Sequence, residues 1–159
     1  MTRKINFTNK FLYIVILFTI FIVSLVFYLF SGPKTRYTVE FPEIGTEDTV
    51  TEIRFLPRNP VQGKINAYVE EILLGPSVPR SRPLFSRGTK ADFCFLREKT
   101  LYVGLNVQAV YQDAESEKFG RGKALFEKNI KKNFPSVKKI EFFVDGHEVK
   151  SSEKSDEKN

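Results

Sequence analysis

The residue types that carry most enzyme chemistry are scarce in this chain. It has one cysteine, Cys94, and one histidine, His147, which together are the formal minimum of a nucleophile and its base. Cys94 stands between two phenylalanines in an apolar run, a position typical of a packed, inert thiol. His147 follows an Asp-Gly dipeptide and is expected in a solvated turn. The pair is therefore not predicted to be catalytic.

Other catalytic patterns are missing as well. The sequence contains no GxSxG, no HExxH and no phosphate-binding glycine loop. Its single cysteine excludes an intrachain disulfide and a cysteine-based zinc site. The carboxylates are scattered, so no metal site is predicted. Two carboxylates would suffice to cleave a glycoside or peptidoglycan, but nothing in the sequence selects a pair. We expect no enzyme and no cofactor.

Basic side chains are the remaining candidates for function. The chain carries a net charge of +6, and two clusters stand out: a Pro-rich segment at residues 75–89 and a lysine-rich segment at residues 123–139. Either cluster is expected to contact a partner or an anionic surface, or else to be only solvated charge. The candidate contact residues are Arg80, Arg82, Arg87, Lys128, Lys131 and Lys132.

A long apolar run near the N-terminus decides where these residues work. Residues 11–30 contain no charged side chain, and as an α-helix they would extend ~30 Å, about the thickness of a bilayer's hydrocarbon core. Arg3, Lys4 and Lys10 precede the run, which favours a cytoplasmic N-terminus. We therefore expect a single-pass anchor in the cytoplasmic membrane, with residues 1–10 inside and the rest of the chain outside.

Two alternatives to a retained anchor, a cleaved signal peptide and a buried core helix, fit the sequence less well. A cleaved signal peptide has a shorter apolar region and small residues before the cleavage site, whereas Leu29 or Phe30 would stand at the −3 position here. A buried core helix needs protein on every side, and this chain is too small to surround one. The three basic residues of the flank supply half of the net charge, so the remainder is only mildly basic and gives weak support to nucleic-acid binding.

The segment after the anchor predicts a linker and then one folded domain. Residues 31–49 contain two prolines and two glycines and predict an extended linker, with residues 37–41 as a short edge strand at most. Alternating or helical apolar periodicity then predicts a fold of order β-α-β-β-α-β within residues 50–149. The predicted strands are 50–56, 91–97, 100–107 and 138–144, and the predicted helices are 61–74 and 123–134.

This order indicates an α+β two-layer sandwich. Such units usually form a four-stranded antiparallel sheet with both helices on one face. The segments 75–89 and 108–122 are predicted loops, and the polar residues 150–159 predict a disordered tail. The same order occurs in RNA-binding RRM domains, but the strand Leu101–Leu105 lacks their aromatic motif, and an outward-facing domain would meet no RNA.

Residues 50–149 resemble the GerMN domain family. The similarity is carried by the helix ending Leu73-Leu74-Gly75-Pro76, by the strand Leu101–Val107, and most by the closing segment FPSVKKIEFFVDG at residues 134–146. The resemblance implies a non-catalytic envelope domain similar to the ring-building folds of membrane-spanning assemblies. The family's namesake carries two copies and a lipid, whereas this chain has one copy and a membrane helix, so a role in sporulation is not implied.

The sequence thus favours a membrane-anchored, extracytoplasmic scaffold or protein-interaction module of a bacterial cell envelope. Its expected partner is another envelope protein or a second copy of the chain. The alternative is a domain that binds cell-wall polymer or anionic lipid through the basic loop at 80–90 and the basic helix at 123–139. The identity of the partner, the oligomeric state and the physiological process do not follow from the sequence.

Overall fold

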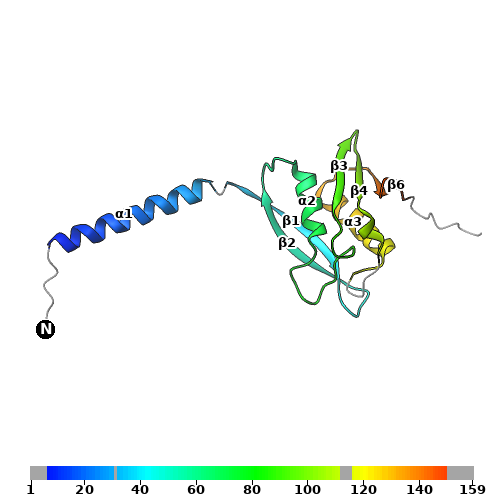
Figure 1. Ribbon diagram of the computed structural model, residues 1–159, viewed down its shortest axis with the longest axis horizontal. Helices are drawn as coiled ribbons and strands as arrows, with labels where there is room; N and C mark the ends of the chain where they lie inside the picture. The colour runs from blue at the N-terminus through cyan, green and yellow to red at the C-terminus, as the bar shows by residue number, and fades with distance from the viewer. Residues whose placement is uncertain (1–6, 31, 112–115, 150–159) are drawn as a thin grey trace, which may run out of the picture. The chain divides into compact units, whose positions relative to one another are not determined.

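The computed structural model describes residues 7–30, 32–111 and 116–149 (Figure 1). The chain divides into two compact units, residues 1–34 and 35–159. The tail predicted at residues 150–159 and most of the cytoplasmic segment predicted at residues 1–10 lie outside the described residues.

The first unit contains the helix α1, Phe7–Phe30. Its segment Lys10–Leu29 has a mean hydropathy of 2.8 and is long and apolar enough to cross a membrane, a test that a signal sequence also passes. None of that segment is buried against protein. The Thr19 hydroxyl donates to the Val15 carbonyl at 2.9 Å, so this polar group is satisfied within the helix.

The second unit begins earlier in the chain than the sequence predicts. The strand β1, Lys34–Pro42, occupies most of the predicted linker, and its Val39 and Phe41 are fully buried. The interpretation of residues 31–49 as an extended linker is therefore wrong. Thr38 and Glu40 alternate with the apolar residues, as in a strand, but the sequence does not show what the segment pairs with. The backbone N–H groups of Thr38 and Glu40 donate to the side chains of Asn133 and Asn129, far along the chain.

Next come the strand β2, Thr49–Pro57, and the helix α2, Lys64–Leu73. β1 and β2 form a two-stranded sheet. The inner side of β2 holds Glu52 and Leu56, while Ile53 and Phe55 remain exposed on its other side. The predicted apolar face of α2 is confirmed, since Tyr68, Val69 and Ile72 are buried and Ile65 and Leu73 pack against the core. Gly75, with φ of 87°, follows the helix end as predicted.

The main sheet has the strand order β3-β4-β5-β6, with bounds Ala91–Arg97, Thr100–Leu105, Lys139–Val144 and His147–Glu148. β3 and β4 pair antiparallel. β4 and β5 pair parallel, and the chain between them includes the helix α3, Phe119–Asn133. The fold is α+β as predicted, but the strands lie in two sheets rather than in one antiparallel sheet. The reason is that β2 pairs with β1 and not with the main sheet, where β4 and β5 are parallel neighbours connected through α3.

Both helices cover the same face of the main sheet, as expected. Leu101, Val103 and Leu105 of β4 are fully buried with the apolar residues of α2 and α3, and Phe126 of α3 meets Phe142 of β5 edge-on with ring centroids 5.1 Å apart. The start of α3 lies four residues before the predicted one. A short 3-10 helix, Val107–Val110, precedes it within the segment predicted as a loop.

The opposite face of the main sheet carries aromatic side chains. Phe95 stacks on Tyr102 at 5.0 Å, and Phe93 contacts Phe143 at 5.6 Å. Phe93 lies directly over Gly104, where a Cβ atom would stand 2.2 Å from its ring, so a larger residue there would displace the Phe93 side chain. The β3–β4 turn has positive φ at both Glu98 and Lys99, the geometry of a two-residue type I′ hairpin.

Candidate functional site

The Pro-rich loop between α2 and β3 is ordered by burial at its middle. Leu84 and Phe85 are only 1% and 4% exposed, and the Phe85 ring lies 5.8 Å from Phe119 and 6.0 Å from Phe126. The backbone of Leu84 also approaches α3 so closely that a Cβ atom on Gly122 would stand 2.0 Å from the Leu84 oxygen. The middle of the segment predicted as a loop at residues 75–89 is thus a packed part of the core.

A charged network holds the start of this loop. The Glu52 carboxylate, on the inner side of β2, accepts hydrogen bonds from the backbone N–H groups of Ser77 and Val78 at 3.1 Å. Arg54 donates to Glu52 at 2.6 Å, to Glu71 at 3.0 Å and to the Gly75 carbonyl at 3.0 Å. Glu52 and Arg54 lie on the same side of β2, within the predicted strand at residues 50–56.

The middle and the end of the loop are fixed by further hydrogen bonds. The N–H of Arg82 donates to the Pro42 carbonyl and the N–H of Ile44 donates to the Arg80 carbonyl, both at 2.8 Å. The Asn106 side chain accepts from the N–H of Lys90 at 3.1 Å and donates to the Gly88 carbonyl at 3.0 Å. The loop is therefore held to β1, β2, α3 and the end of β4, and its surface is pre-organised.

These contacts shape a groove of about 1100 Å³ along the loop. Its wall is mainly apolar and includes three prolines, whose fixed φ angles stiffen it. Leu74 stands at this wall with 80% of its surface exposed. We call it the loop groove, and it is lined by Ile44, Glu70, residues 73–79, residues 81–83 and residues 85–91.

The predicted arginines divide at this groove. Arg82 and Arg87 line it, whereas Arg80 does not: its side chain is 66% exposed, with Glu43 at 3.9 Å. The half-buried guanidinium of Arg82 has no side-chain hydrogen bond or ion pair among the residues that the structure describes. Beside it the Ser81 hydroxyl is buried, at 7% residue exposure, and also lacks a partner there. Sequence patterns gave no signal for Ser81.

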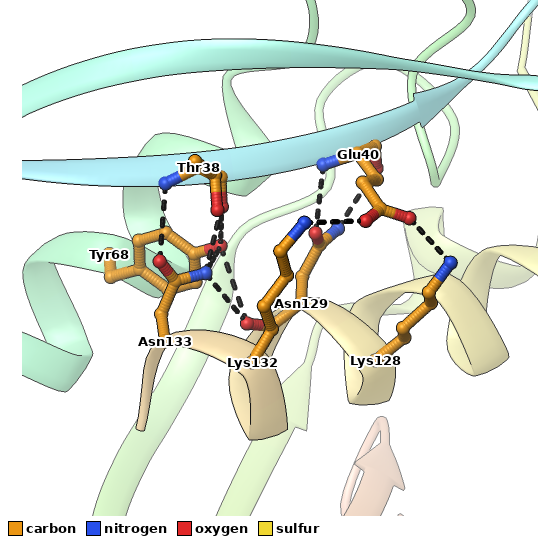
Figure 2. Close-up of polar contacts among 7 residues, drawn as sticks. All are labelled: Thr38, Glu40, Tyr68, Lys128, Asn129, Lys132 and Asn133. Carbon is orange, nitrogen blue, oxygen red and sulfur yellow. Dashed lines mark hydrogen bonds and ion pairs between the residues drawn. The ribbon is translucent and has the colours of Figure 1, made fainter. Parts of the chain in front are cut away.

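The predicted lysines of α3 are engaged within the domain. Lys128 and Lys132 form ion pairs with the buried carboxylate of Glu40 at 2.6 Å and 2.8 Å (Figure 2). Hydrogen bonds from Lys128 and then Lys132 hold the pKa of Glu40 below its usual value. Lys131 lies 3.8 Å from Glu127 on its own helix. This cluster therefore carries less free charge than its composition suggests.

The same face of α3 clamps β1, a feature that sequence reasoning missed. Asn129 accepts from the Glu40 N–H at 2.8 Å and donates to the Glu40 carbonyl at 2.9 Å (Figure 2). Asn133, one turn further, makes the same pair of bonds with Thr38 at 3.1 Å and 2.7 Å. The i, i+4 spacing on the helix matches the i, i+2 spacing on the strand. Two asparagines four apart on the helix are the only sequence signal.

Cys94 and His147 lie too far apart to act as a nucleophile and its base. Cys94 lies on β3 and His147 on β6, with two strands between them, so at ~4.8 Å per strand they are ~14 Å apart. Burial, followed by the nearby charge of Glu70, raises the pKa of the Cys94 thiol to about 11. His147 is exposed. Within the described residues no three His, Cys, Asp or Glu side chains gather at metal-binding distance.

Comparisons with solved structures agree with this architecture. The tandem GerMN domains of the sporulation protein GerM from Bacillus subtilis match with a TM-score of 0.51 and 17% identity, over 72% of this chain and 40% of that one. The domain has a GerMN-like fold. A protein described as a lipoprotein of Clostridium perfringens matches over 74% of this chain and 78% of its own, at 20% identity and a TM-score of 0.42. No family model and no curated protein matches the sequence.

Proposed function

We propose that this protein is a membrane-anchored, extracytoplasmic module of a bacterial cell envelope that binds another envelope protein at the loop groove. The observation that carries the proposal is the groove itself, a pre-organised and mainly apolar surface whose wall includes Arg82, a half-buried side chain without an ion-pair partner among the described residues. Rigid surfaces bind with a small loss of conformational entropy, so a loop held this firmly suits recognition. The GerMN-like fold and the apolar helix α1 support the location.

The state of the reactive groups supports a non-catalytic role. The Cys94 thiol is protonated near neutral pH and lies far from His147. Binding to wall polymer or anionic lipid is the competing function, and the ion pairs of Lys128 and Lys132 argue against a broad cationic surface on α3.

Two experiments test the proposal in cells that express the full chain. A reporter fused after residue 150 is expected to be active only outside the cytoplasm, and activity confined to the cytoplasm would contradict the topology. A photo-crosslinking amino acid at Leu74 is expected to capture discrete proteins at moderate salt. The matched control places it at Lys131, which is also exposed but lies on α3 away from the groove. Equal capture at both positions, or none at Leu74, would contradict the proposed surface.

A further inference from the structure

The loop groove has features that select one kind of occupant within the proposed function. We propose that it binds an extended peptide segment in which a carboxylate side chain is flanked by apolar residues, with Arg82 pairing the carboxylate and the Ser81 hydroxyl completing its hydrogen bonds. This rests on the proposed function only for the source of the peptide, since the site itself is argued from the groove.

The carboxylate is inferred from the two unpaired polar groups. Arg82 is half-buried without an ion-pair partner among the described residues, and Ser81 hides its hydroxyl from solvent without a hydrogen-bond partner there. An unpaired buried polar group costs free energy, which a ligand recovers by pairing with it. A planar carboxylate accepts both from a guanidinium and from a neighbouring hydroxyl.

The apolar flanks are inferred from the rest of the wall. Leu73, Leu74, Val78 and Ile44 line the groove together with prolines, and both Leu74 and Ile44 leave about half or more of their surface exposed, at 80% and 49%. The one carboxylate in the lining, Glu70, is hydrogen-bonded by Gln62 at 3.1 Å. An apolar wall with an embedded cation complements a chain that carries apolar groups on both sides of an anion.

A peptide is favoured over a polymer of phosphates or a lipid surface. The volume of about 1100 Å³ lies at the upper limit of small-molecule pockets, so it suits several residues of chain. A polyanion needs a row of free cations, whereas Lys128 and Lys132 are paired with Glu40 and Arg80 stands outside the groove. The cations that line the groove are Arg82, Arg87 and Lys90, of which Arg87 and Lys90 are exposed and Arg82 is half-buried in the apolar wall. A half-buried arginine is suited to a single charge held in register.

The test uses the full chain in nanodiscs of zwitterionic lipid and a display library of random twelve-residue peptides. Enriched peptides are expected to share an acidic residue flanked by apolar ones. The best of them, resynthesised, is expected to bind ~10-fold or more weakly to Arg82→Gln, since a charge-assisted pair is lost. Replacing its acidic residue by the amide should weaken binding to the parent chain to the same extent, and the two changes together should add little.

The matched control is Arg80→Gln. It removes the same charge from the same loop but from a side chain outside the groove, so binding should be unchanged. Enrichment of peptides without an acidic residue, equal effects of Arg80→Gln and Arg82→Gln, or no enrichment at all would overturn the peptide site. If the chain instead binds phosphatidylglycerol vesicles and both variants weaken that binding equally, the surface is a general anion contact and the proposal is wrong.

Failure here is distinguishable from failure of the proposed function. Crosslinks at Leu74 in cells together with a negative peptide selection would retain the partner-binding module and remove the acidic peptide. Peptide binding that depends on Arg82, with a reporter active only in the cytoplasm, would retain the site and remove the extracytoplasmic function.

Discussion

Two basic regions of this domain look alike in the sequence and differ in the structure. On α3, Lys128 and Lys132 surround a buried carboxylate and help to hold β1 in place. In the loop groove, Arg82 has no such counterion among the described residues and stands in an apolar wall. Internal pairing, rather than the number of charges, separates structural cations from cations that remain available to a ligand. The predictions below test whether the α3 face is structural and the loop groove is a binding surface.

The largest effect is expected from Asn129→Ala. The side chain is fully buried, and its loss leaves both backbone groups of Glu40 without their partner. Two unsatisfied buried groups are expected to lower the free energy of unfolding by about 4 kcal/mol. Denaturant unfolding of the full chain in detergent measures this. The control Lys128→Ala removes an exposed partner of Glu40 and is expected to cost less than about 1 kcal/mol. Similar losses for both variants would contradict the clamp.

The next effect concerns the contact between α3 and the loop. Gly122→Ala places a methyl group 2.0 Å from the Leu84 carbonyl oxygen, so the loop must move, at a cost of about 2–3 kcal/mol. The matched change Gly120→Ala meets nothing within 4 Å and is expected to stabilise the helix by up to about 1 kcal/mol. Thermal unfolding compares the two variants. Equal shifts of the same sign would show that the loop does not pack against α3 as described.

A third prediction concerns the start of the loop groove. Glu52→Gln keeps the size of the side chain but removes the charge that pairs with Arg54 and accepts from two N–H groups. We expect a loss of about 2 kcal/mol, because Arg54 is left partly buried with only Glu71 as counterion. Hydrogen exchange at Ser77 and Val78 is expected to accelerate. Unchanged exchange at these amides would show that the Glu52 network does not order the loop.

The smallest effect is the dependence of stability on acid. Because the pKa of Glu40 is lowered in the folded state, its contribution is fully present above the ordinary value of 4.5 and is lost as the pH falls from 4.5 through the lowered pKa. Glu40→Gln should flatten the decline of stability in this window by less than about 1 kcal/mol, since both lysines are partly exposed. Unfolding curves between pH 5 and pH 3 measure it. A steeper decline of stability with falling pH in the variant would contradict the stabilising contribution assigned to the Glu40 carboxylate.

Local patterns were sufficient for the elements that bury one face. The α2 stripe follows from periodicity, because its burial is set by neighbouring residues in the chain. The alternation of β2 predicts a strand but not its inner side, since that side carries Glu52 while Ile53 and Phe55 are exposed. The full extent of β1 could not be predicted from local patterns, because the hydrogen-bond partners of Thr38 and Glu40 lie 95 and 89 residues away in the sequence. The early start of α3 could not be predicted for a similar reason: Gly120 and Gly122 weaken the helical signal, and Gly122 is explained only by the approach of Leu84.

The candidate site was found in part. Proline and arginine content located the loop, and two of its three arginines line the groove. The separation of Arg80 from Arg82 could not be foreseen, because it depends on which side of the backbone meets Pro42 and Glu43 in β1 and the turn after it. Pairing of Lys128 and Lys132 with Glu40 likewise needs the three-dimensional contact between α3 and β1.

The position of β1 would have a mechanical consequence for the proposed membrane anchoring of the chain. Because only residues 31–33 separate α1 from β1, any tension from the anchor would enter the domain through this strand. β1 is bonded to β2 along one edge and to Asn129 and Asn133 along the other. A pull would therefore have to break bonds along both edges before it reached the helix and loop that shape the groove. The hydrogen bonds of Asn129 and Asn133 to β1 would thus limit how much tension from the proposed anchor reaches the proposed binding surface.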